Sequence, residues 1–292
     1  MSFTVTQYIL FLFSFFAVGG AMSLAAYRDD RTASFVGSVF AGLGSLAGLC
    51  AGIAAIVAPQ ATTYSIATMF PFLTLSIHID KLAGIFLTII SLVAFLATVY
   101  GYGYMRHYFG KYNIGAFYFF YNLFLGSMML VTLANHALFF LVAWELMSLA
   151  SYFLVVFDHK EHENVQAGFL YFIITHIATA CIMLMFLILA HVTGSFDFDV
   201  WRTSTADISP LVAGIIFLLA IVGFGTKAGV IPFHVWLPAA HPAAPSQVSA
   251  LMSGVMIKTG IFMLIRVLLD FFSATPAWLG VLVLILGAVS SL

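Results

Sequence analysis

Long apolar runs, separated by short polar connectors, are the dominant pattern of this chain. Nine runs follow one another, at approximately residues 4–27, 33–58, 81–105, 114–134, 136–157, 165–193, 210–240, 245–270 and 275–292. About 20 apolar residues are enough for one helix to cross a bilayer. The pattern therefore predicts an all-α fold, a polytopic transmembrane bundle of about nine helices.

The stretch 59–80 departs from this pattern. It contains Pro59 and Pro71, which are typical of turns. Apolar residues near its end alternate with other residues, at Leu73, Leu75, Ile77 and Ile79. Alternation with a period of two is typical of strands. This stretch is predicted to form a small extended hairpin at the membrane surface.

Composition agrees with a membrane protein and excludes several other classes. The chain is 63% hydrophobic and 7% charged, with a net charge of −1. No basic patch indicates a nucleic-acid partner. There is no phosphate-binding loop, and the two cysteines, Cys50 and Cys181, lie far apart in the sequence. The sequence therefore predicts no nucleotide, metal or iron–sulfur cofactor in this chain.

The lysines and arginines of the connectors are distributed unevenly. The odd-numbered connectors carry Arg28, Arg31, Arg106, Lys111 and Lys160, whereas the even-numbered ones carry Lys81 and Arg202. Short cytoplasmic loops are enriched in lysine and arginine. We therefore expect a multi-pass protein of the inner (cytoplasmic) membrane, with its N-terminus outside.

The last apolar segment is short for a membrane helix. From Trp278 to Leu292 there are 15 residues, or roughly 22 Å of helix, against a hydrocarbon core of about 30 Å. The sequence predicts that the chain stops inside a helix and is truncated at its C-terminus.

Glu145, Lys227 and Lys258 are charged residues that lie well inside apolar segments. A charge at the centre of a bilayer costs about 2.5–3.5 kcal/mol on insertion scales and usually marks an ion or proton path. A lysine with a movable carboxylate partner would be a switchable proton site. Each residue also has a structural interpretation, as a hydrogen-bonded neutral acid or as a lysine that reaches to the surface. Ser148 and Tyr152 share the helix face of Glu145.

Glycines and prolines interrupt the apolar segment that contains Lys227. Gly225, Gly229 and Pro232 predict a helix break, since proline cannot donate to the helix ladder and glycine permits unusual backbone angles. A broken helix at membrane depth is tolerated only when it is buried in protein or lines a wet cavity. Charge and helix break together favour transport over simple anchoring.

Three histidines are candidates for a proton relay, because histidine titrates near neutral pH. His176 is central in its apolar segment, and His234 and His241 lie in the proline-rich break. A histidine on an apolar face can equally be a hydrogen-bonded core residue, so both interpretations remain open.

Two long motifs resemble a known family. They are WELMSLASY around Glu145 and KAGVIPFHVWLPAAHPAAPSQVSALMSGVMIK from Lys227 to Lys258. Both are similar to the antiporter-like proton-translocating subunits of respiratory complex I, Mrp-type antiporters and membrane-bound hydrogenases. The segment PAAPSQVSALMSGVMIKTG is similar in particular to the large membrane subunit of formate hydrogenlyase-type hydrogenases. Ala239 departs from the aspartate of many complex I members.

The resemblance implies a mechanism and an architecture. It makes Glu145 and Lys227 a charge pair, Lys258 the relay lysine of the eighth helix, and His234 the histidine of the broken helix. It also implies about fourteen helices in two inverted repeats. The divisions that it predicts are 1–112 (helices 1–3), 113–270 (the translocation repeat, helices 4–8) and 271–292 (the start of the second repeat).

The function that the resemblance implies is proton translocation by a non-redox membrane subunit of an oxidoreductase complex, either quinone reductase-like or hydrogenase-like. Its partners would be the other membrane and peripheral subunits, the lipid bilayer and protons. The alternative is a cation/proton antiporter subunit of Mrp type, in which sodium is also moved. A purely structural scaffold is a third class, and the three intramembrane charges argue against it.

Overall fold

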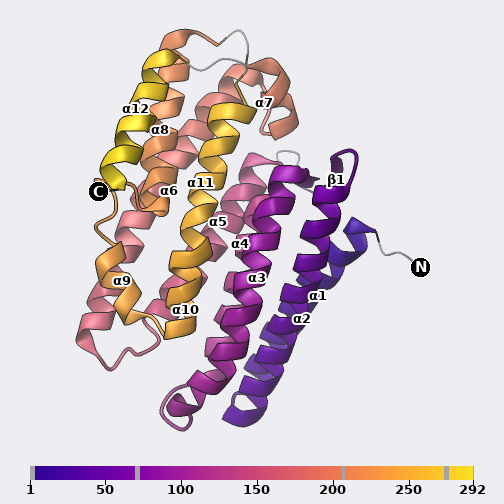
Figure 1. Cartoon of the computed structure of the whole chain (residues 1–292), viewed down its shortest axis with the longest axis vertical. Coiled ribbons are helices and arrows are strands. Elements are labelled where there is room, and N and C mark those ends of the chain that lie inside the picture. The colour runs from indigo at the N-terminus through magenta and orange to yellow at the C-terminus, as the bar shows by residue number, and fades with distance from the viewer. Residues whose placement is uncertain (1–3, 70–72, 206–207, 273–275, 292) are drawn as a thin grey trace.

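The helices form one bundle in the computed structural model, which describes residues 4–69, 73–205, 208–272 and 276–291. Eight helices within these ranges are long and apolar enough to span a membrane. The ninth predicted segment forms a shorter apolar helix, α12 (Ala277–Ser290). The prediction of an all-α polytopic bundle is confirmed. The first helices and α12 lie on opposite sides of the bundle (Figure 1).

The first six spans follow the predicted segments closely. They are α1 (Val5–Ala25), α2 (Asp30–Val57), α3 (Lys81–Tyr104), α4 (Ile114–Leu133), α5 (Ala137–Val155) and α6 (His162–Thr193). A 3-10 turn, η1 (Met105–Tyr108), continues α3, and a short helix, α7 (Phe198–Ser204), follows α6. Side chains define several helix starts, because Asp29, Asp80 and Asn113 each accept a backbone N–H of the first turn.

Small residues and an enclosed central helix determine the packing. A Cβ atom at Gly48 of α2 would lie 2.4 Å from the hydroxyl oxygen of Ser91 on α3. Such close approach between helices is typical of small residues in membrane bundles. In α4, 72% of the most apolar window is buried, against 33% in α1 and in α6. The core therefore lies around α4, and the outer helices leave one face exposed on the outside of the bundle.

The predicted segment 210–240 is not one helix. Its first part, α8 (Pro210–Ala228), ends at Gly229, whose φ of 74° is left-handed and favours glycine. A series of turns leads to a short helix, α9 (Leu237–Ala243). The eighth span follows as α10 (Ser246–Leu251), a π-helical turn η2 (Met252–Met256), α11 (Ile257–Ile265) and a second π-helical turn η3 (Arg266–Asp270).

The predicted hairpin is confirmed. Strands β1 (Thr62–Ala67) and β2 (Thr74–Ile79) pair in antiparallel fashion, with Thr62 opposite Ile79. Pro71 of the predicted turn lies outside the described residues. Backbone hydrogen bonds link the connector between α4 and α5 to this hairpin and to α7. The Asn135 N–H donates to the Ser76 carbonyl of β2, and the Phe198 N–H of α7 donates to the Asn135 carbonyl. The hairpin thus covers one end of the bundle.

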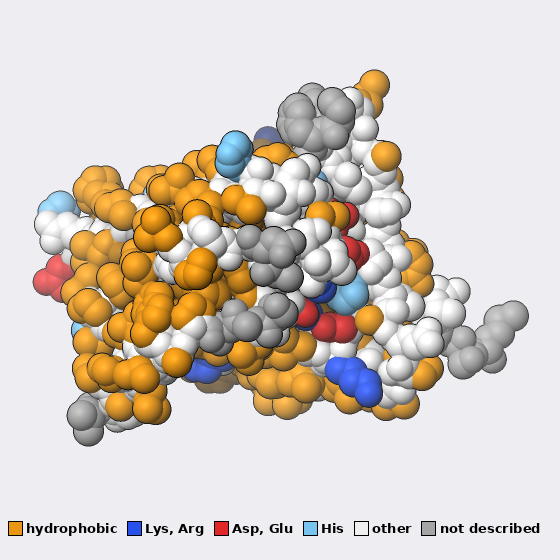
Figure 2. Space-filling view, turned by 90° about the horizontal axis from the view of Figure 1, so that it is seen from above, with side chains coloured by type: hydrophobic (Ala, Val, Ile, Leu, Met, Phe, Trp, Pro, Cys, Tyr) orange, Lys and Arg blue, Asp and Glu red, His pale blue; other side chains and the backbone are white. Residues whose placement is uncertain are grey.

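A network of charged side chains joins several elements at this same end. Arg266 donates to both carboxylate oxygens of Asp80, over 2.6 and 2.7 Å, and to Asp270 over 3.0 Å. Arg202 donates to Asp270 over 2.9 Å and to Asp199 over 2.5 Å. Figure 2 views this end face, where acidic, basic and histidine side chains gather beside a largely hydrophobic surface.

This network holds the end of α11 against the start of α3. Arg266 is 6% exposed, and a charge at such a position is tolerated only when it is paired and hydrogen-bonded. Burial by itself would raise the pKa of Asp80, but the hydrogen bonds and the charge of Arg266 outweigh it, so the pKa lies below its usual value. A carboxyl group of this kind stabilises the fold above its unfolded pKa of about 3.9 and loses that effect as the pH falls through the lower folded value.

Replacing this carboxylate has a predictable pH signature. Asp80→Asn should lower the free energy of unfolding by about 1.5–3 kcal/mol, the range for hydrogen bonds to charged groups. The difference from the unmodified protein should be constant between about pH 5 and pH 8 and shrink below about pH 4. Denaturant unfolding in detergent at a series of pH values measures it. Lys81→Gln, at the exposed neighbouring position, is the control. An Asp80→Asn effect that vanished at pH 7 would contradict the assignment.

Candidate functional site

Lys227 lies in the last turn of α8, immediately before the helix break, and is 1% exposed. Its ammonium group donates to the hydroxyl oxygen of Ser148 on α5 over 3.0 Å and to that of Tyr171 on α6 over 2.7 Å. It also lies over the rings of Trp144 and Tyr171, 5.8 and 5.0 Å from their centroids. Two hydroxyl groups and two aromatic faces therefore surround a buried cation.

The Tyr171 hydroxyl group extends this set of contacts. It lies 2.6 Å from the hydroxyl oxygen of Ser151, which itself donates to the Met147 carbonyl over 2.8 Å. Because Ser151 uses its proton on that carbonyl, Tyr171 donates to Ser151 while it accepts from Lys227. The lysine is thus the end of a buried chain of hydroxyl groups that runs back into α5.

Glu145 pairs with His176 and makes no salt bridge with Lys227 among the described residues. Its Oε2 atom lies 3.2 Å from Nε2 of His176, and the two side chains are 29% and 34% exposed. Oε1 of Glu145 is buried and has no hydrogen-bond partner in the described parts of the chain. The predicted coupling of Glu145 and Lys227 therefore involves no direct contact here: Ser148, one helical turn after Glu145, accepts from the ammonium group.

The helix break is stabilised by an aromatic side chain from the segment that follows it. The indole N–H of Trp236, a fully buried side chain, donates to the carbonyl of Thr226 over 2.8 Å. Its ring lies 4.9 Å from that of Tyr171. The same carbonyl accepts the Gly229 N–H over 3.2 Å, so the indole adds a second hydrogen bond at the end of α8. Trp236 therefore fixes the same tyrosine that binds Lys227.

The two histidines of the break lie close to this site and are half-buried. The ring of His241 is 6.2 Å from that of Trp236. Neither Nδ1 of His234 nor Nε2 of His241 has a hydrogen-bond partner within the described ranges, although both atoms are buried. Buried polar atoms without a protein partner are usual positions for ordered water.

The structure places Lys258 differently from the other candidates. Its side chain is exposed, and its ammonium group donates to the Ser253 carbonyl in the preceding π-helical turn over 3.3 Å. Lys258 is therefore not enclosed by the described part of the chain, and its predicted role as a relay lysine stays a prediction. Its neighbour Thr259 faces inward and is fully buried. Lys258 therefore lies on the outer face of the helix whose inner face packs against the Lys227 site.

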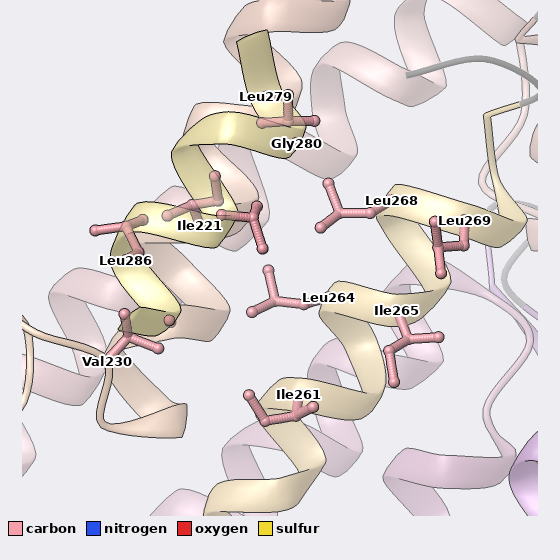
Figure 3. Close-up of a pocket in the computed structure, with 13 residues that line it drawn as sticks. Ile221, Val230, Ile261, Leu264, Ile265, Leu268, Leu269, Leu279, Gly280 and Leu286 are labelled. Atoms are coloured by element: carbon pink, nitrogen blue, oxygen red, sulfur yellow. The ribbon is translucent and has the colours of Figure 1, made fainter. Parts of the chain in front are cut away.

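An apolar cleft of about 400 Å³ lies beside the break, between α8, α11 and α12. Figure 3 shows Ile221, Leu264 and Leu286 among the side chains that face it. Gly225, two residues before Lys227, forms part of its wall. Because its walls are almost entirely apolar, the cleft offers no polar route to the lysine from this side.

Tyr171 and Ser151 are functional candidates that the sequence interpretation missed. A signal existed on α6, because Tyr171, Thr175 and Thr179 recur every four residues and all are buried. Polar residues at this spacing line one face of a helix, and in an apolar segment such a face points inward. Ser151 follows Ser148 by three residues on α5 in the same way.

Comparison with known proteins agrees with this geometry. Residues 134–292, more than half of the chain, match the family described as NADH:quinone oxidoreductase/Mrp antiporter, transmembrane. The chain belongs to this family. Residues 71–118 also match the N-terminus of complex I chain 5. The resemblance inferred from the two motifs is confirmed.

Members of the family resemble this chain over most of its length. Hydrogenase-4 component B of Escherichia coli (strain K12) is 40% identical over 286 residues, which are 97% of this chain and 41% of that protein. A chain of the archaeal membrane-bound sulfane sulfur reductase superposes with a TM-score of 0.82 at 18% identity, over 97% of this chain and 57% of that one. A chain of the Mrp complex from Dietzia sp. superposes with a TM-score of 0.72 at 24% identity, over 92% and 28%.

The family members are longer than this chain, which spans less than half of the hydrogenase component. The part of this chain that matches the family model includes the Lys227 site, because Glu145, Tyr171 and Lys227 lie within residues 134–292. The names of these relatives describe components of membrane complexes. The two superpositions establish the shared fold of the family.

Removing the tyrosine hydroxyl group tests the geometry of the lysine site. Tyr171→Phe keeps the ring that packs on Trp236 and removes the acceptor of the Lys227 ammonium group. We expect a loss of about 1.5–3 kcal/mol in the free energy of unfolding, because a buried charge loses a hydrogen bond. Combined with Ser148→Ala, the effect should differ from the sum of the single effects, since both hydroxyl groups bind one cation. Unfolding in mixed detergent micelles measures both.

A matched control exists on the preceding helix. Tyr152 of α5 makes ring contacts with Phe153 and Phe172, and its hydroxyl group has no hydrogen bond among the contacts described. Tyr152→Phe should therefore leave the unfolding free energy almost unchanged. Equal effects of Tyr171→Phe and Tyr152→Phe would contradict a specific role for the Tyr171 hydroxyl group.

Proposed function

We propose that this chain translocates protons as the membrane subunit of a multi-subunit redox complex of the hydrogenase or quinone reductase type. One observation carries the proposal: a buried lysine at a helix break, held by hydroxyl groups, beside a carboxylate–histidine pair. Buried ionisable groups in membrane helices mark proton relays. An anchoring helix needs none of them.

The proposed relay uses the two polar clusters in sequence. A proton on the Glu145–His176 pair changes the charge one helical turn from Ser148, which binds the Lys227 ammonium group. Charges interact strongly in a low-dielectric interior. Neutralising or recharging the pair therefore alters how firmly Lys227 holds its proton. Tyr171 and Ser151 extend the hydrogen-bond network of Lys227 toward α5.

The relatives support a redox-driven complex as the setting. Hydrogenase-4 component B and the sulfane sulfur reductase, a respiratory membrane complex, are named after redox assemblies. In our proposal electron transfer takes place in partner subunits, and this chain supplies the proton path. One charge that crosses 100 mV requires about 2.3 kcal/mol, so a few sites of this kind could couple to one redox step.

A cation/proton antiporter subunit is the second candidate. The Mrp complex shares the fold, and the family description includes Mrp antiporters. Such a protein would use the same buried lysine and carboxylate without a redox partner. The two functions differ in one observable: an antiporter needs sodium or another cation for proton movement, whereas a redox-driven pump needs electron flow.

The proposed orientation follows from the connectors. Most lysines and arginines of the connectors lie in three of them, which join α1 to α2, α3 to α4, and α5 to α6. These three connectors would face the cytoplasm. The N-terminus and the β1–β2 hairpin would then lie outside the inner membrane.

Removing either charge of the relay should abolish pumping. In the full-length subunit within its complex, Lys227→Ala and Glu145→Gln are each expected to reduce proton uptake into membrane vesicles to background, while the complex still assembles. Lys111→Gln, an exposed cation outside the site, is the control for loss of charge. Wild-type pumping in both site variants would show that the residues are structural. Proton uptake that requires sodium and not electron donor would favour the antiporter.

Lys258 is tested by a substitution that keeps its charge. Arginine remains protonated in proteins, so Lys258→Arg should preserve assembly and eliminate proton uptake if the lysine itself passes on a proton. Normal uptake in this variant would mean that only the positive charge at this position is needed. Parallel measurement of electron transfer distinguishes uncoupling from loss of the complex.

A further inference from the structure

A second polar site lies far from Lys227, at the end of the bundle where α2 begins and α3 ends. Arg31, Tyr102, Arg106 and Phe109 line a hollow of about 470 Å³ there. We propose that this hollow binds the headgroup of an anionic phospholipid from the surrounding membrane. The proposal is independent of proton translocation, because none of these residues contacts the Lys227 site.

The two arginines are free to bind an anion. In the described parts of the chain neither guanidinium group forms a salt bridge with a carboxylate. The nearby acids accept from other groups: Asp29 accepts from the Thr32 hydroxyl group over 2.6 Å and from the backbone N–H of Arg31 over 3.1 Å, and Asp30 accepts from the Gly110 N–H over 2.6 Å. Two unpaired guanidinium groups at one hollow match the oxygens of a phosphate group.

The aromatic side chains give the hollow a defined shape. The guanidinium group of Arg106 lies over the Tyr102 ring, 4.9 Å from its centroid, which orients its N–H groups. The Asp30–Gly110 hydrogen bond ties the connector after η1 to the start of α2, next to Phe109. The site is therefore built by three elements and is not a pair of unrelated surface arginines.

A row of tyrosines places this hollow at the membrane boundary. Tyr100, Tyr104, Tyr108 and Tyr112 follow one another along α3, η1 and the connector after η1, with successive ring centroids 5.7, 5.9 and 5.8 Å apart. Tyrosine is enriched where the hydrocarbon core meets the headgroups. Basic pockets between membrane helices at such a level bind phospholipid headgroups.

An apolar surface leads from the hollow along the two helices toward the membrane centre. Phe35 of α2 contacts Tyr102, with ring centroids 6.5 Å apart, and is 56% exposed. Val99 and Leu96 precede Tyr102 by three and six residues on α3 and are 61% and 59% exposed. This surface can receive acyl chains, which a soluble phosphate does not have. The occupant is therefore a lipid and not free phosphate.

The experiment uses the full-length protein, purified and placed in nanodiscs of phosphatidylcholine with a minor fraction of phosphatidylglycerol. Native mass spectrometry after release measures which lipid stays bound. We expect phosphatidylglycerol to be enriched on the unmodified protein. The double variant Arg31→Gln/Arg106→Gln should weaken its retention by about tenfold or more for each guanidinium group lost.

The control removes the same charge from the same end of the bundle. Arg28→Gln/Lys111→Gln changes two exposed cations that do not line the hollow and should keep the enrichment. Equal losses in both double variants would mean general attraction of anionic lipid and would overturn the site. If the glutamine variant does not fold, Arg31→Lys/Arg106→Lys replaces it in the experiment. Its retention of phosphatidylglycerol should be lower than that of the unmodified protein but not lost, because ammonium groups keep the charge and lack the planar fork of guanidinium.

A competition experiment distinguishes the lipid from a soluble anion. Inorganic phosphate and glycerol phosphate, added at millimolar concentration, should leave the bound phosphatidylglycerol in place. Displacement of the lipid by either anion, or equal thermal stabilisation by inorganic phosphate alone, would show that the hollow recognises a free phosphate group, and the assignment to a lipid would fail.

Discussion

The burial of one ammonium group determines how the second half of this bundle is arranged. Lys227 makes its hydrogen bonds to two neutral hydroxyl groups, Ser148 and Tyr171, while the carboxylate of Glu145 is bound to His176. A tight ion pair in a low-dielectric interior would hold its proton in a fixed place. Hydroxyl groups satisfy the cation with weaker binding, so its protonation remains responsive to nearby charges.

The helix break and the lysine site depend on each other through Trp236. Its indole satisfies the Thr226 carbonyl at the end of α8, and its ring packs on Tyr171. The same carbonyl also accepts the Gly229 N–H over 3.2 Å, so the indole joins the capped end of α8 to the segment that follows the break. The break is therefore part of the way in which the tyrosine hydroxyl group is brought to the ammonium group.

Apolar length and periodicity were enough to predict the spans, since eight helices coincide with predicted segments. The glycine and proline residues near Lys227 were enough to predict where α8 ends. The partners of the charges could not be predicted in this way. Opposite charges suggested Glu145 with Lys227, but which side chains meet depends on how α5, α6 and α8 rotate about their axes. Similarly, Lys258 lies on the outward face of its helix, and a sequence window does not reveal the direction of a helix face in the bundle.

The absence of a side chain at Gly260 has a mechanical consequence. A Cβ atom there would lie 2.6 Å from the Phe224 carbonyl oxygen and 3.0 Å from the Ala228 nitrogen, so α11 rests directly on the backbone turn that carries Lys227. Six residues later, roughly 9 Å along the helix, Arg266 is bound to Asp80. The helical segment between these two residues is in contact with its neighbours at both ends. One short stretch of backbone therefore joins the turn that carries Lys227 to the charged side chains at the end face.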